Sequence, residues 1–281
     1  NDIRAGINDK RGYSIDRLFE LMCADESFGT NKLGSEQHAE TITAAALTKH
    51  YRSLIASSGI EIFYCGAHDN ERVEAAVRGA LSALPRTGSS GLFGTEVLLH
   101  PREKEPRSYT DKLEVNQGKL TLGFRLGKCM LSPNYAALLV FNAVFGGSVT
   151  SKLFSNVREK LSLCYYASSV IEKHKGIMVV ASGVEFSRFE EAKREILAQL
   201  DAVRRGDVSD WELLSARRAV ITSIKSTMDK PSGLEELFFD QSVASVKITP
   251  DELAALADGV TLSEVAEIAS CIELDTVYYL T

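Results

Sequence analysis

The sequence predicts an α+β fold in which helices cover one face of a mostly antiparallel sheet. Short apolar segments bounded by turn residues occur at 113–124, 163–171 and 176–184, as expected for strands. From residue 187 onward helix-start signals dominate, up to a last apolar segment at 276–280. Because strands and helices fall largely in separate runs, we expect the helices to gather on one face of the sheet.

The first part of the chain is predicted to be mainly helical. Residues 2–24 contain an apolar stripe at helical spacing. Its members are Ile15, Leu18, Phe19 and Met22. Thr43 can cap a second helix, and Asp69 begins a third helix that Pro85 ends. The apolar stripe of the second helix consists of Leu47, Tyr51 and Leu54.

Between the second and third helices, Ile60 to Cys65 is apolar enough to form a strand. A single strand leaves both edges unpaired, so we expect it to pair with backbone from elsewhere. The partner could be strands upstream of residue 1, the second unit of this chain, or another chain. The unpaired strand leads us to expect that part of a first domain lies upstream. Asn1 is not a Met and no signal-peptide pattern follows it, so the chain could be trimmed or be a piece of a longer protein.

Residues 86–108 interrupt the periodic pattern and are predicted to be a linker. The segment is polar and rich in glycine near its start, and it contains Pro101 and Pro106. We therefore divide the chain into the end of a first domain at 1–85 and a complete second domain at 109–281.

The second unit contains the clearest local signals. Leu120, Leu122 and Phe124 alternate as in a half-buried strand, and Ser132-Pro133 is expected to begin a helix. Five further helix starts are predicted from pairs that fit the S/T-x-x-E capping box. These pairs are Ser187/Glu190, Ser209/Glu212, Ser232/Glu235, Thr249/Glu252 and Thr261/Glu264.

Composition excludes several classes of partner. The net charge is −6, so the chain has no basic excess with which to neutralise nucleic-acid phosphates. No apolar run approaches the roughly 20 residues of a membrane-spanning helix. The five cysteines are scattered in apolar settings without a C-x-x-C, which indicates buried, reduced thiols in a cytoplasmic protein.

The segment from Gly146 to Tyr165 is the main candidate for a functional site. Gly146 and Gly147 end a helix, Arg158 lies on a short helix, and Tyr165 opens the next strand. Arg158 and Tyr165 could converge on one point, where both can donate hydrogen bonds to a peptide carbonyl or an oxyanion. The structural alternative is a solvated arginine and a half-buried strand tyrosine.

Other chemistries are less well supported. The glycines follow a helix rather than a strand, so a phosphate loop is disfavoured; a left-handed helix cap and close packing explain them. Cys164 is on an apolar strand and is expected to be inert. No two of the five histidines are four residues apart, so we assign none of them to a metal. The histidines are His38, His50, His68, His100 and His174.

The order of these motifs resembles the second, zinc-free domain of the pitrilysin/insulinase family of zinc peptidases. The resemblance rests on G-G-x-x-x-S-x-L-F from Gly146, R-E-K at 158–160 and Thr276-Val277-Tyr278-Tyr279-Leu280. Asp25-Glu26-Ser27-Phe28-Gly29 also resembles the closing part of that family's first domain. The resemblance covers nearly the whole chain and implies a metallopeptidase-homology domain of the LuxS/MPP-like type.

In that family, two domains close on an extended peptide like a clamshell. The resemblance implies that Arg158 and Tyr165 lean into the peptide site, while Tyr166 faces the other side of the strand. It also implies a peptide contact near Gly146 and Gly147. The expected ligand is a peptide or unfolded polypeptide.

The family's zinc motif, H-x-x-E-H, does not occur in these 281 residues. We therefore expect no catalytic residue, no metal ligand and no cofactor within them. Zinc ligands could lie upstream of residue 1. Alternatively, the protein could belong to the zinc-less branch, bacterial by its closest motifs, and pair with a zinc-bearing homologue or form a homodimer. The sequence thus predicts either half of a zinc peptidase or a catalytically inactive peptide-binding or structural subunit.

Overall fold

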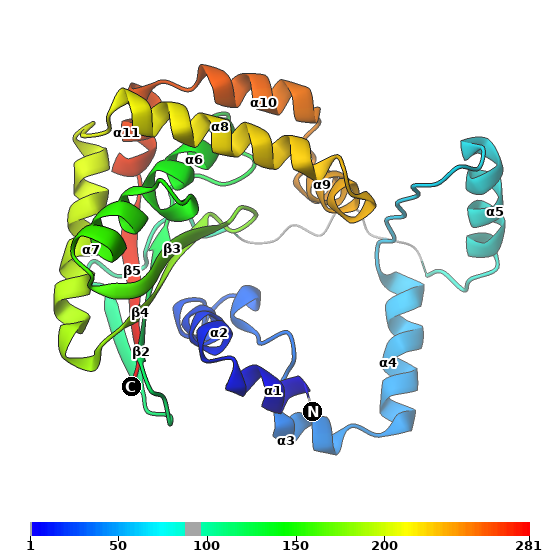
Figure 1. Cartoon of the computed structure of the whole chain (residues 1–281). Coiled ribbons are helices and arrows are strands. Elements are labelled where there is room, and N and C mark those ends of the chain that lie inside the picture. The colour runs from blue at the N-terminus through cyan, green and yellow to red at the C-terminus, as the bar shows by residue number, and fades with distance from the viewer. Residues whose placement is uncertain (1, 88–96) are drawn as a thin grey trace.

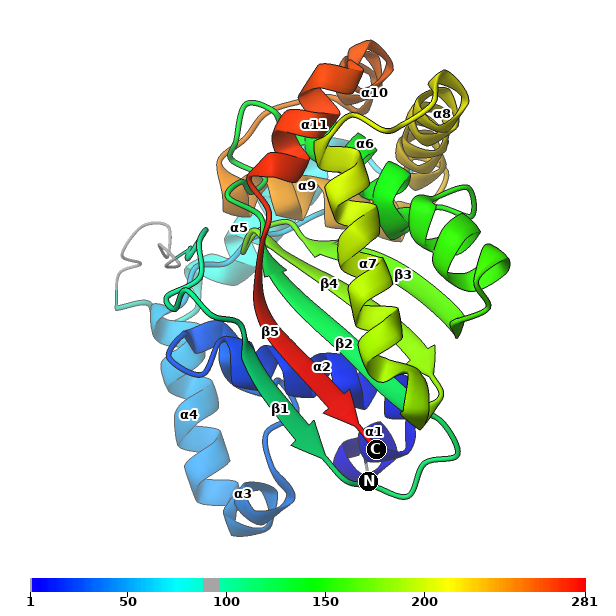
Figure 2. The same cartoon turned by 90° about the vertical axis from the view of Figure 1, so that its left-hand side faces the viewer.

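A five-stranded sheet forms the centre of the protein (Figures 1 and 2). The computed structural model describes residues 2–87 and 97–281. The strand order is β1-β5-β2-β4-β3, and only the β1–β5 pair is parallel, so the mostly antiparallel α+β fold is confirmed. The strands are β1 (Arg107–Asp111), β2 (Gly118–Arg125), β3 (Cys164–Glu172), β4 (Ile177–Val184) and β5 (Glu273–Leu280).

The helices of the second unit cover one face of this sheet, as predicted (Figure 2). Their apolar stripes and the facing side of the strands form the larger hydrophobic core, which includes Leu122, Phe141 and Ile196. These helices are α6 (Tyr135–Asn142), α7 (Phe189–Arg204), α8 (Asp210–Thr227), α10 (Pro250–Gly259) and α11 (Leu262–Ser270).

The opposite face of the sheet is covered by α2 (Lys10–Met22), which follows α1 (Asp2–Asn8). Leu18 and Met22 pack there against Val179 and Tyr278 in a second, smaller core. The sequence predicted a half-buried β2, but Leu120 to Arg125 is buried on both faces. That prediction was wrong because α2 covers the face that was expected to meet solvent.

A buried ionic cluster fixes the C-terminal end of α2 to the sheet. The Arg125 side chain is only 1% exposed and donates to Glu26 at 2.5 Å and to Asp275 at 3.2 Å. Arg107 also donates to Asp275, at 2.6 Å, and to the carbonyl of Met22, at 2.9 Å. Such buried charges persist only when paired, so the cluster ties β1, β2, β5 and the end of α2 together.

Residues 30–87 form a helical arm that stands apart from the sheet (Figure 1). Thr43 and Asp69 accept backbone hydrogen bonds as N-caps, as predicted. Phe63, in the loop between α4 and α5, stacks on Phe238 of α9 (Pro231–Ala244), with ring centroids 6.0 Å apart. The arm contains α3 (Glu36–Thr41), α4 (Ala44–Ser57) and α5 (Asn70–Ser82), after a 3-10 turn at Ser27–Gly29.

The predicted strand at Ile60 to Cys65 does not form among the described residues. The segment has no regular secondary structure, and Ile62 remains 52% exposed. Strand formation requires a neighbouring backbone, and no described strand lies beside this segment. The last two residues of the predicted linker 86–108 already belong to β1. Residues 88–96 of the linker lie outside the described part of the chain.

The capping boxes at Ser209, Thr249 and Thr261 form with both reciprocal hydrogen bonds. The other two predicted boxes were wrong, because α7 begins at Phe189 and α9 begins at Pro231. The helix predicted at Ser132-Pro133 begins only at Tyr135. The Ser132 hydroxyl instead accepts a hydrogen bond from the Cys129 backbone amide at 3.0 Å.

All five cysteines are free thiols. Cys23, Cys129 and Cys164 are buried and Cys271 is partly buried, but Cys65 is exposed. The prediction of a buried thiol was wrong for Cys65 because its segment is not packed into a sheet. No helix within residues 2–87 and 97–281 is both long and apolar enough to cross a bilayer.

Candidate functional site

Arg158 and Tyr165 line the same surface depression, which has a volume of about 420 Å³. Arg158 comes from the π-helical segment Leu153–Lys160, and Tyr165 lies near the start of β3. Glu185, the residue directly after β4, also lines the depression. The structure therefore brings the two predicted residues together. The remaining lining residues are Glu159, Ser162, Leu163 and Cys164.

The turn between the helical segment and β3 holds these two residues in place. Ser162 adopts a left-handed backbone conformation, with φ 48°, that lets the chain reverse direction. The backbone amide of Leu163 then donates to the carbonyl of Val157 at 3.0 Å. Arg188, directly before α7, donates a hydrogen bond to the carbonyl of Ser162 at a distance of 3.2 Å. The turn is thus hydrogen-bonded on both sides, which fixes where β3 begins.

Tyr165 is exposed because it forms a bulge in β3. The register with β4 shifts between Cys164 and Tyr166, which leaves Tyr165 without a residue opposite it. The Tyr165 side chain is consequently 69% exposed. Tyr166 lies against α2, with the Arg11 guanidinium 4.5 Å from its ring centroid. The strand thus separates an accessible tyrosine from a packed one.

Arg158 is held by its own helix but keeps free donors. Its guanidinium lies 4.6 Å from the ring centroid of Phe154, one helical turn earlier. Its Nε lies 3.5 Å from a carboxylate oxygen of Glu159, and its side chain is 40% exposed. A long, exposed ion pair of this kind is weak, so the two Nη groups of Arg158 remain available to a ligand.

Cys164 does not offer a nucleophile at this site. The residue is buried, and burial raises the pKa of its thiol, so the thiolate is scarce at neutral pH. The depression therefore offers an arginine and a tyrosine as donors, with Glu159 and Glu185 as acceptors at its rim. This arrangement can bind an extended peptide through backbone carbonyl and amide groups.

Gly146 and Gly147 do not line the depression. Gly146 is buried, and a Cβ there would lie 2.6 Å from the Ser169 hydroxyl of β3. A Cβ on Gly147 would lie 2.5 Å from the Asn142 amide. Neither glycine has a positive φ, so the expected left-handed cap was wrong, whereas close packing accounts for both. These glycines let the helix end approach β3.

The described residues do not fit a zinc site. His100 pairs only with Glu273, and His174 pairs only with Asp240 among carboxylates. No group of three or more potential ligands occurs within 2–87 and 97–281. Zinc sites in proteins use at least three such ligands, and the described residues do not bring three together.

Comparison with known proteins gives the family. Residues 41–220 match the model of the "Peptidase M16 inactive domain". This chain belongs to the M16 peptidase family. The "Probable inactive metalloprotease YmfF" of Bacillus subtilis is 34% identical over 279 residues, which are 99% of this chain and 64% of that protein.

Solved structures share the fold of this M16 chain. A conserved protein from Enterococcus faecalis superposes with a TM-score of 0.88 and 26% identity, over 99% of this chain and 65% of that one. A peptidase M16 inactive domain from Pseudomonas fluorescens superposes with a TM-score of 0.77 and 15% identity, over 99% and 68%. This chain therefore spans about two thirds of the length of these relatives.

The sequence did not lead us to predict that Glu185 lines the depression. Glu185 directly follows the last residue of β4, and β4 runs antiparallel to β3. The end of one strand therefore lies beside the start of the other, which places Glu185 near Tyr165. The strand boundaries predicted from the sequence contain this signal.

Proposed function

We propose that this M16 chain forms the zinc-free half of a peptide-enclosing chamber, in which Arg158 and Tyr165 bind a backbone carbonyl. The observation that supports the proposal is that both donors line one open depression, on a bulged strand and a neighbouring helix. Tyr165 is largely exposed, and the ring contact and the ion pair of Arg158 are both with residues of its own helix, so the fold does not depend on a contact between the two side chains.

The chemistry favours binding over cleavage. Guanidinium and phenol groups can both donate to one carbonyl oxygen, and they would do so whether or not the peptide is cut. The B. subtilis relative is named a probable inactive metalloprotease, and we extend that description to this chain. In a protein with a zinc-bearing half, the same two donors would face the scissile carbonyl or its oxyanion.

A second candidate function is that of a structural subunit that completes a chamber with a partner. The helical arm supports it, because the apolar stripe of α4 and the segment after it are exposed. A zinc-bearing homologue, a second copy of this chain, or the remainder of a first domain that ends near residue 85 could cover this surface. The exposed side chains are Leu47, Tyr51, Leu54, Ile60, Ile62 and Tyr64.

Peptide binding to the full-length protein tests the first proposal directly. A fluorescent, unstructured peptide is titrated against the wild type, Arg158→Ala, Arg158→Lys and Tyr165→Phe, with anisotropy as the readout. We expect Arg158→Ala to weaken binding by about ten- to a hundredfold, the value of one charge-assisted hydrogen bond. Tyr165→Phe should cost less, and Arg158→Lys should restore part of the loss.

The matched control is Arg218→Ala, which removes an exposed arginine from α8. It should leave the affinity unchanged. If Arg158→Ala and Tyr165→Phe both bind like the wild type, the depression is not the peptide site. If the wild type does not bind peptide but assembles with a zinc-bearing homologue, the structural candidate is favoured instead.

We also propose a cytoplasmic location for the protein. Five free thiols, with no disulfide among them, fit a reducing compartment.

A further inference from the structure

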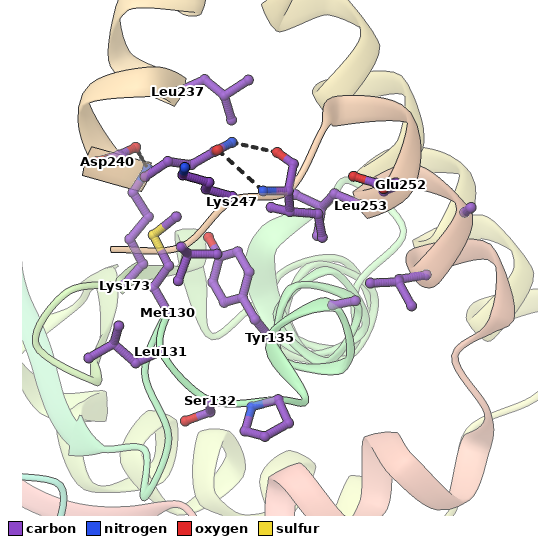
Figure 3. A pocket seen from close by; sticks show the side chains of 17 residues that line it. Met130, Leu131, Ser132, Tyr135, Lys173, Leu237, Asp240, Lys247, Glu252 and Leu253 are labelled. Atoms are coloured by element: carbon purple, nitrogen blue, oxygen red, sulfur yellow. Dashed lines mark hydrogen bonds and ion pairs between the residues drawn. The ribbon is translucent and has the colours of Figure 1, made fainter. Parts of the chain in front are cut away.

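A second cavity lies between the start of α6, helix α9, the loop after it, and α10 (Figure 3). Its volume is about 760 Å³, within the range of roughly 300–1,000 Å³ found for small-molecule sites. It shares no lining residue with the depression around Arg158.

Most of the cavity wall is apolar. The side chains come from three separate parts of the chain, so the cavity exists only in the folded protein. Those that form the apolar lining include Met130, Leu237, Val246, Ile248, Leu253 and Leu256. Met130 and Leu253 are each only 6% exposed, whereas Leu256 is 54% exposed and marks the open side. An aliphatic group would replace water along this wall.

The polar part of the wall is built by buried residues of α9. Gln241 is 8% exposed, and its amide donates to the carbonyl of Ile248 at 2.6 Å and accepts from the amide of Ile248 at 3.3 Å. Asp240 is 7% exposed and binds both Lys173 and His174 Nε2, the latter at 2.7 Å. These contacts hold the loop and neutralise the Asp240 carboxylate.

Two polar groups in the cavity have no partner among the described residues. The Tyr135 side chain points into the cavity (Figure 3), and its hydroxyl makes no hydrogen bond within 2–87 and 97–281. Burial, together with Asp240 and Glu172, raises the pKa of Tyr135, so the phenol stays protonated and can donate. Lys247 also lines the cavity, and no described carboxylate pairs with it.

We propose that this cavity binds a small amphipathic carboxylate, with its aliphatic chain along Leu237, Ile248 and Leu253 and its carboxylate at Tyr135 and Lys247. The other acidic lining residue, Glu252, is already engaged as the capping partner of Thr249 at 2.8 Å. Of the two basic lining residues, Lys173 pairs with Asp240, whereas Lys247 has no carboxylate partner among the described residues, which favours an anionic head group over a cationic one.

Calorimetric titration of the full-length protein with decanoate tests this site. We expect saturable binding at one site, weakened about tenfold by Lys247→Met and less by Tyr135→Phe. Decanol, which has the same chain without the charge, should bind the wild type about as weakly as decanoate binds Lys247→Met. Leu253→Trp should fill the cavity and abolish binding. Lys225→Met, on an exposed face of α8, is the matched control and should bind like the wild type.

Three outcomes would overturn the proposal: no saturable decanoate binding to the wild type, equal affinity for decanol and decanoate, or unchanged affinity in Lys247→Met. The comparison with decanol and the Lys247→Met variant still test the proposed carboxylate site if Leu253→Trp fails to fold. Loss of peptide binding in Arg158→Ala would not affect this result, because the two sites share no residue.

Discussion

Helices α2 and α4 carry similar apolar stripes but meet opposite environments. In α2, Leu18 is fully buried against the sheet, whereas Leu54 of α4 is 48% exposed. Both helices have an N-cap side chain that accepts a backbone hydrogen bond. The difference therefore lies in what covers the stripe and not in the helix itself.

This contrast shows what a periodic pattern can and cannot predict. Spacing of apolar residues determines that a helix has one apolar face, but not which surface buries that face. Burying one large aliphatic side chain stabilises a protein by about 1.5–3 kcal/mol. Helix α2 gains this stabilisation from β2, β4 and β5, while α4 gains little from the described residues.

Removing Arg125 should have the largest effect on the α2 side of this comparison. Arg125→Ala leaves the Glu26 carboxylate, 3% exposed, without its ion-pair partner, and it removes one of the two arginine partners of the Asp275 carboxylate, 2% exposed. We expect a loss of about 3–5 kcal/mol in the free energy of unfolding, measured by urea denaturation. Arg102→Ala breaks the exposed pair with Asp25 and should cost less than about 1 kcal/mol. Equal losses would contradict the structural role of the cluster.

A matched pair of leucine truncations compares the two helices directly. Leu18→Ala should destabilise by about 2–5 kcal/mol, because it opens a cavity between α2 and the sheet. Leu54→Ala in the 281-residue chain should change the free energy of unfolding by less than about 0.5 kcal/mol. If Leu54→Ala is costly only in the full-length protein, another part of that protein covers the arm.

The local parts of the fold could be predicted from the sequence. The strands β3, β4 and β5 and the caps at Thr43, Asp69 and Ser209 depend on residues close together in the chain. The long-range parts could not. Nothing in the spacing of residues showed that α2 would cover β2, or that Arg125 would meet Glu26, 99 residues away.

The candidate site was predictable only in part. Arg158 and Tyr165 were identified from their spacing on a helix and the strand after it, and they do line one depression. The bulge that exposes Tyr165 and the left-handed Ser162 depend on register and backbone strain, which sequence patterns do not encode. The role of the pair in binding remains a prediction.

A pair of glycine substitutions should shift stability in opposite directions in the two regions. A Cβ at Gly123 of β2 would lie 2.6 Å from the Met22 sulfur and 3.2 Å from Leu18. Gly123→Ala should therefore cost about 1–3 kcal/mol by pushing α2 away from the sheet. Gly79 lies in α5 with nothing within 4 Å of the added Cβ. Gly79→Ala should instead stabilise α5 by about 0.5–1 kcal/mol, measured by thermal unfolding. A neutral Gly123→Ala would mean that α2 does not pack closely on β2.

Thiol labelling should show how differently α2 and the arm protect a cysteine side chain. Burial raises the pKa of Cys23, at the end of α2, to about 12, whereas Cys65 of the arm is exposed. At pH 8 only about one Cys23 thiol in ten thousand is ionised, and the thiolate is the reactive form. Native-state alkylation followed by mass spectrometry should therefore modify Cys65 first. The rate at Cys23 should keep rising with pH above 9, because its thiol titrates only near 12. Cys65→Ser is the control that isolates the slow reaction. If Cys23 reacts as fast as Cys65 at pH 8, then α2 leaves the sheet often enough to behave like the arm.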